Sequence, residues 1–108
     1  MSHKAKKIVV ITEKLIVDQV KRFIEENGAS GYTVMTAGGK GSRGARSEGR
    51  NAVTDSYVNV KIEIITTDED VARNIADKVT EKFFDNYSGI TYIEDVEIIR
   101  PQKFLKDE

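Results

Sequence analysis

The sequence of 108 residues contains no cysteine, no tryptophan, one proline and one histidine. The lack of cysteine excludes a disulfide framework, a thiolate metal site and a cysteine nucleophile. With His3 as the one histidine, most metal sites and acid–base schemes built on imidazole are also excluded, so we expect no metal ion and no catalytic residue. The chain has no apolar run near the roughly 18 residues that a membrane-spanning helix needs, and its start shows no signal-peptide cleavage site, which favours a cytoplasmic protein.

What is present is typical of one folded domain. Hydrophobic residues make up 39% of the chain and charged residues 32%, and the length is close to that of a common domain, so we treat residues 1–108 as a single domain. The formal net charge is −1, but residues 38–50 hold four cations and one anion, a local charge of +3 that leaves −4 elsewhere. Such a focused cationic segment should attract small anions more than long polyanions.

The apolar patterning predicts the element order β-α-β-β-α-β. The strands are expected at Lys7–Thr12, Gly31–Ala37, Tyr57–Thr66 and Ile90–Ile99, and the helices from Leu15 to Gly28 and from a Thr67 cap to Phe83. This order predicts an α+β ferredoxin-like fold, a four-stranded antiparallel sheet with both helices on one face. The first and last strands carry apolar residues on both faces, so we expect the uncovered face to meet another subunit.

The loop between the second and third strands, about residues 38–55, is rich in glycine and cations. Glycines allow backbone amides to approach an anion, and lysine or arginine adds charge-assisted donors for phosphate oxygens. It is not a Walker A loop, because it joins two strands rather than a strand and a helix. A solvated hairpin connection is the plain alternative, but long connections of this kind are uncommon unless functional. The candidate anion-binding residues are Gly38, Gly39, Lys40, Gly41, Ser42, Arg43 and Arg46.

Two other functions share this element order. An RNA-recognition domain stacks bases on aromatic residues of its first and third strands, but here the first strand has none and the third has only Tyr57 at its start, so we expect no nucleic-acid partner. Acylphosphatases hold phosphate directly after the first strand, where this chain has Thr12, Glu13 and Lys14. We interpret Glu13 and Lys14 as a solvated strand end.

The runs GYTVMTAGGKGSRGARS, ITEKLI and YSGITYI together resemble the SbtB type of PII-like proteins, cyanobacterial regulators associated with bicarbonate transport. The resemblance spans roughly Lys7 to Arg100 and leaves open a related carboxysome-associated PII-like role. It implies a homotrimer with nucleotide clefts between adjacent subunits and a long T-loop after the second strand. Cyclic AMP, AMP, ADP and ATP are then effectors rather than obligatory cofactors, and nucleotide identity changes the T-loop and hence partner binding.

Carried over by motif, the resemblance places phosphate contacts at Lys40, Gly41, Ser42, Arg43 and Arg46. It also assigns Thr36 to the strand that lines the cleft, and a closing B-loop to Tyr87, Ser88, Gly89 and Ile90. The implied partner is a membrane bicarbonate transporter that binds the T-loop and recruits the protein to the inner membrane.

The sequence departs from many SbtB proteins at its end. Those proteins carry a cysteine-containing hairpin linked to redox control and nucleotide hydrolysis, whereas this chain ends in the polar tail 101–108 without cysteine. We therefore expect no redox switching and absent or slow hydrolysis, with an ATP- or ADP-hydrolysing enzyme and an RNA-binding domain as the alternatives. Residues 44–53 should be disordered or variable without a partner, because glycine-rich sequence lacks the apolar area that offsets ordering entropy.

Overall fold

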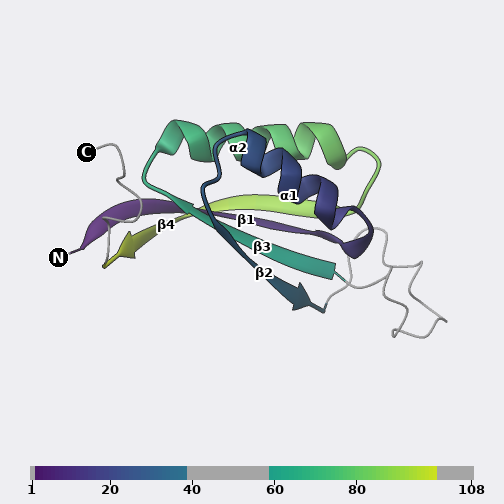
Figure 1. Ribbon diagram of the computed structural model, residues 1–108, viewed down its shortest axis with the longest axis horizontal. Helices are drawn as coiled ribbons and strands as arrows, with labels where there is room; N and C mark the ends of the chain where they lie inside the picture. The colour runs from purple at the N-terminus through teal and green to yellow at the C-terminus, as the bar shows by residue number, and fades with distance from the viewer. Residues whose placement is uncertain (1, 39–58, 100–108) are drawn as a thin grey trace.

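The computed structural model describes residues 2–38 and 59–99, which form a four-stranded sheet with two helices packed on one face (Figure 1). The strand order is β2-β3-β1-β4, and each neighbouring pair is antiparallel. This arrangement confirms the predicted ferredoxin-like fold. The elements in chain order are β1 (His3–Glu13), the 3-10 helix η1 (Lys14–Ile16), α1 (Val17–Glu26), β2 (Tyr32–Ala37), β3 (Asn59–Thr66), α2 (Glu69–Phe83) and β4 (Gly89–Ile98).

Strand β1 begins four residues earlier than the apolar pattern predicts, at His3 instead of Lys7. Its first residues are mostly polar, so they give no apolar signal. They are strand because their backbone pairs with β4, in a register that runs from His3 opposite Ile98 to Thr12 opposite Gly89. The predicted start of the third strand at Tyr57 lies outside the described residues.

The face of the sheet beneath the helices holds the hydrophobic core. Alternate residues of the two central strands point toward the helices, because successive side chains of a strand lie on opposite faces. Phe23 of α1 meets Phe83 of α2 edge to face, with ring centroids 5.6 Å apart. Burial of each aliphatic side chain in this core stabilises the folded state by about 1.5–3 kcal/mol. The core includes Ile8, Val10, Ile62 and Ile64 of the sheet, Val20 and Ile24 of α1, and Ala72, Ile75, Val79 and Phe83 of α2.

The predicted cap of the second helix is wrong by one residue. Asp68, not Thr67, precedes α2 as its N-cap, and its Oδ1 accepts hydrogen bonds from the backbone N–H groups of Asp70 (2.9 Å) and Val71 (3.2 Å). Aspartate and threonine are both common caps, so the sequence alone does not choose between two adjacent candidates. The acidic residues Glu69 and Asp70 occupy the first turn, where their charge opposes the positive end of the helix dipole.

The face of the sheet away from the helices, here called the open face, is partly apolar. Val9 is fully buried although it belongs to this face, because Glu63 and Tyr92 lie beside it on the neighbouring strands. Met35, Ile90 and Tyr92 remain 36%, 57% and 38% exposed. Apolar residues therefore lie on both faces of β1 and β4, as the sequence indicates.

A row of alternating charges also crosses the open face. Lys61 Nζ lies 3.5 Å from Glu63 Oε2 on the same strand, and that carboxylate oxygen lies 3.6 Å from Lys7 Nζ on β1. Lys7 Nζ is in turn 3.3 Å from Glu94 Oε1 on β4. We call these four residues the charge ladder. The hydrogen bond to Glu94 is the main cause of the raised pKa of Lys7.

Within the part of the chain that the structure describes, neither helix is long and apolar enough to span a membrane.

Candidate functional site

One end of the sheet brings together the described members of the predicted site. One row of backbone pairs crosses the four strands and consists of Thr36, Val60, Thr12 and Gly89. In the next row Ala37 pairs with Asn59, and Asn59 pairs with Glu13. Because β2 ends and β3 begins in this second row, both strand ends lie at the same end of the sheet as the turn that leads into β4 (Figure 1). We call the pairing of Ala37 with Asn59 the loop root.

The two described parts of the predicted site nevertheless lie on opposite edges of the sheet. Thr36 and Gly38 belong to the β2 edge, whereas Tyr87–Ile90 lead into the β4 edge. Three strand spacings of about 4.8 Å put Thr36 and Gly89 about 14 Å apart within one chain, so one small anion cannot contact both. Six further candidates lie outside the described residues, and their role stays a prediction: Gly39, Lys40, Gly41, Ser42, Arg43 and Arg46.

The turn between α2 and β4 is held at Ser88 by two adjacent side chains of β1. Thr12 Oγ1 donates a hydrogen bond to the backbone oxygen of Ser88 (3.0 Å), and the Ser88 N–H donates to Glu13 Oε2 (2.6 Å). Thr12 is 1% exposed and Glu13 is 5% exposed. We call this pair of contacts the Ser88 clamp. It fixes both backbone polar groups of Ser88 in a segment that has no regular structure of its own.

The interpretation of Glu13 as a solvated strand end is therefore wrong. Its carboxylate is buried because its partner, the Ser88 amide, arrives from a part of the chain 75 residues away. A charged residue after an apolar strand normally ends in water, and the sequence pattern carries no sign of this distant contact. Glu13 is thus a candidate functional residue that sequence reasoning missed.

Gly89 has no room for a side chain. A Cβ atom there would lie 2.3 Å and 2.4 Å from two carbon atoms of the Phe84 ring, and 2.9 Å from the backbone oxygen of Ile11. The chain can therefore turn from α2 into β4 in this conformation only with glycine at this position. The predicted B-loop glycine has a steric basis in the fold.

Comparison with known proteins identifies the family. The family model for the nitrogen regulatory protein P-II matches residues 5–103. The chain belongs to the P-II family. It is similar to a PII-like signalling protein from Thermus thermophilus, with 31% identity, a TM-score of 0.79 and coverage of 96% of this chain and 98% of that one. Membership of this family makes the chain a PII-like signalling protein.

Two further structures share the P-II fold. The PII-like protein CPII from Thiomonas intermedia, solved with ADP, AMP and bicarbonate, is 24% identical with a TM-score of 0.78, and 96% of each chain is covered. GlnK of B. subtilis, solved as an ATP complex, is 20% identical with a TM-score of 0.56, covering 89% of this chain and 84% of that one. At these identities the likeness supports the fold alone.

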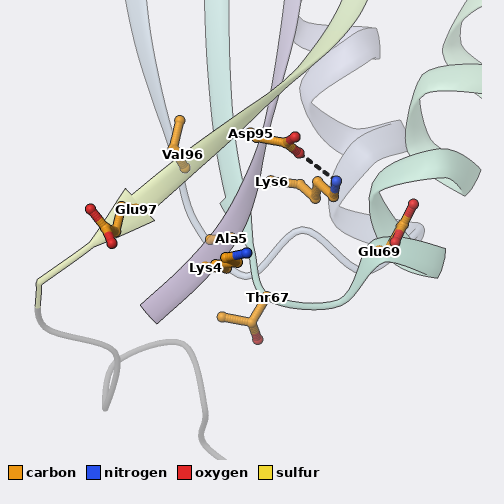
Figure 2. A pocket seen from close by; sticks show the side chains of 8 residues that line it. All are labelled: Lys4, Ala5, Lys6, Thr67, Glu69, Asp95, Val96 and Glu97. Atoms are coloured by element: carbon orange, nitrogen blue, oxygen red, sulfur yellow. Dashed lines mark hydrogen bonds and ion pairs between the residues drawn. The ribbon is translucent and has the colours of Figure 1, made fainter. Parts of the chain in front are cut away.

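The P-II chain also has a hollow of about 570 Å³ at the opposite end of the sheet (Figure 2). Within it Lys6 is paired with Asp95 across β1 and β4. This hydrogen bond is the main cause of the raised pKa of Lys6 and of the lowered pKa of Asp95. None of the predicted site residues lines this hollow. Its lining consists of Lys4, Ala5, Lys6, Thr67, Glu69, Asp95, Val96 and Glu97.

Among residues 2–38 and 59–99, no three histidine, cysteine, aspartate or glutamate side chains come together as a metal site requires.

Proposed function

We propose that this PII-like protein senses adenine nucleotides and reports their identity to a partner protein through residues 39–58, its T-loop. The observation that carries the proposal is that the loop root and the Ser88–Gly89 turn lie at the same end of the sheet of a P-II family chain. Structures of the same fold with ADP, AMP and ATP support it. The Thr36 and Gly89 edges, about 14 Å apart, then serve different parts of the nucleotide or different clefts.

The phosphates bind at the base of the T-loop, where cations and glycine amides are concentrated. Lys40, Arg43 and Arg46 supply charge, and Ser42 supplies a hydroxyl. The adenine lies near Gly89, as the resemblance of the YSGITYI segment implies. The remaining lining residues are Thr36, Gly38, Gly39, Gly41, Tyr87, Ser88 and Ile90.

The clefts form between subunits of a homotrimer. The open face supports this assembly, because Met35, Ile90 and Tyr92 expose apolar area that no element of the described chain covers. A symmetric assembly buries this face and brings the β2 side of one subunit toward the β4 side of another.

The finer assignment is to the SbtB type, with a bicarbonate transporter at the membrane as partner and cyclic AMP among the effectors. It rests on the resemblance of the GGKGSR and YSGITYI segments. If a nucleotide binds one of two T-loop conformations more tightly than the other, its binding in the cleft changes the affinity of the protein for the partner.

Titration calorimetry with cyclic AMP, AMP, ADP, ATP and bicarbonate tests the proposal. At least one nucleotide should bind, and Arg46→Ala should weaken it by about 10- to 150-fold, the worth of one charge-assisted contact of about 1.5–3 kcal/mol. Arg50→Ala is the matched control, because it removes a loop cation outside the candidate set. Equal effects of both variants would point to general electrostatic attraction, and a lack of binding by every nucleotide would refute the function. Rapid phosphate release would instead favour the enzyme alternative.

A further inference from the structure

The Ser88 clamp reaches the turn from both faces of β1. Because side chains of consecutive strand residues point to opposite faces, Thr12 approaches Ser88 from the helix side and Glu13 from the open side. The backbone of Ser88 therefore cannot shift without breaking at least one of two hydrogen bonds. The turn is fixed where the proposed adenine contact at Gly89 begins.

The Glu13 contact is the shorter half of the clamp. The Ser88 nitrogen lies 2.6 Å from Glu13 Oε2, whereas Thr12 Oγ1 lies 3.0 Å from the backbone oxygen of Ser88. Burying a carboxylate is unfavourable unless it accepts hydrogen bonds of this kind. The location of Glu13 is therefore explained by what it holds, since packing alone would favour an apolar residue there.

Glu13 also belongs to the row that contains the loop root. Its backbone pairs with Asn59, and Asn59 pairs with Ala37, where residues 39–58 leave and rejoin the sheet. The side chain of Glu13 thus contacts the turn, while its backbone is part of the strand beside the loop root. If either the turn or the loop root moves, a contact of Glu13 changes.

We propose that Glu13 is a positioning residue for nucleotide binding: its carboxylate holds the Ser88 backbone in the conformation that the ligand requires and links this turn to the loop root. The inference rests on the proposed nucleotide function. It assigns to Glu13 no contact with the nucleotide itself. The acceptor oxygen, and not the volume or the charge of the side chain, performs this role.

The experiment combines calorimetry with ADP and hydrogen exchange of the Ser88 amide in three variants. Glu13→Ala removes the acceptor and should weaken ADP by about tenfold or more while the Ser88 amide loses protection by a similar factor. Glu13→Gln keeps an acceptor oxygen and should stay within about threefold of the unaltered protein in both readouts. Val20→Ala opens a cavity in the core beneath α1, far along the chain from the turn, and should lower stability while leaving affinity unchanged.

The outcomes separate the inference from the function on which it rests. If the unaltered protein does not bind ADP or another adenine nucleotide, the proposed function fails. If it binds and Glu13→Ala binds equally well, or Val20→Ala loses as much affinity, the positioning role is refuted. Loss of affinity in Glu13→Gln with a protected Ser88 amide would also refute it, because charge and not position would then matter. Should Glu13→Ala not fold, Glu13→Met keeps most of the side-chain volume but lacks the acceptor oxygen, and unchanged affinity and exchange in that variant would refute the proposal.

Discussion

Replacing Gly89 by alanine tests the steric description of the B-loop. The new methyl group would lie 2.3 Å and 2.4 Å from the Phe84 ring and 2.9 Å from the backbone oxygen of Ile11. The ring can rotate or shift, but the Ile11 carbonyl belongs to β1, one of the two central strands, and moves much less readily. Overpacking of this kind costs about 1–3 kcal/mol. Because the strand resists movement, we expect the turn to move instead, so that both stability and nucleotide affinity decrease.

The assay is thermal and urea unfolding at one fixed protein concentration, since assembly makes apparent stability depend on concentration. A loss of about 1–3 kcal/mol corresponds to a decrease in Tm of at least about 4 °C in a chain of this size. Gly31→Ala is the matched control, because a Cβ atom at Gly31 has no neighbour within 4 Å. We expect that variant to be neutral or slightly stabilised through the lower entropy of its unfolded chain.

A second substitution identifies which contact matters. Phe84→Leu removes the ring atoms nearest to the new methyl group, so the double variant Gly89→Ala with Phe84→Leu should recover part of the loss. The contact with the Ile11 oxygen remains, so recovery should be incomplete. If Gly89→Ala is as stable as the unaltered protein, or if full recovery follows the loss of the ring, the reasoning from the fixed carbonyl is wrong.

Three further predictions concern the helix cap, the ion pair of the hollow and the open face. Asp68→Ala should lower the free energy of unfolding by about 0.5–2 kcal/mol through loss of the α2 cap, whereas Glu81→Ala on the exposed side of the same helix should change it little in urea titrations. Asp95 should titrate in NMR with a pKa below the ordinary value of about 3.9. Because this pKa is lowered in the folded state, the Lys6 pair stabilises the fold above the ordinary pKa, and that stabilisation is lost as pH falls through the folded pKa. Asp95→Asn should abolish this acid dependence, and an unshifted titration of Asp95 would contradict the ion pair. Tyr92→Arg should shift a trimer toward monomers in light scattering while Leu15→Arg, exposed outside the open face, should not; equal behaviour of the two would place the subunit contact elsewhere.

The periodic parts of the fold follow from the sequence, and the exceptions have local causes. Helix α2 and strand β3 end where the sequence predicts, at Phe83 and Thr66, because one face of each element is apolar and the other polar. The early start of β1 escapes this reasoning, since its lysines form strand only through pairing with β4. The choice of Asp68 over Thr67 depends on the backbone path between β3 and α2, which no residue type determines.

The candidate site is predictable only in part for a similar reason. The sequence indicates Gly89 as a turn residue, but the reason it must be glycine lies in Phe84 and Ile11, which the fold brings to it. It indicates no role for Glu13, because that role requires the amide of Ser88 from the other half of the chain. The roles of Gly89 and Glu13 both depend on contacts between distant segments, which a local sequence pattern does not contain.

The charge ladder affects the solubility of the subunit before assembly. Its four side chains run diagonally over three strands and separate the apolar residues near Ile90 and Tyr92 from those near Ala5 and Val96. In a subunit that has not yet assembled, the exposed apolar area at Ile90 and Tyr92 is therefore bounded by charged side chains. Because large contiguous apolar patches promote aggregation, replacing Lys7 and Glu63 together by leucine should yield more insoluble protein in cells, even if the folded product is no less stable.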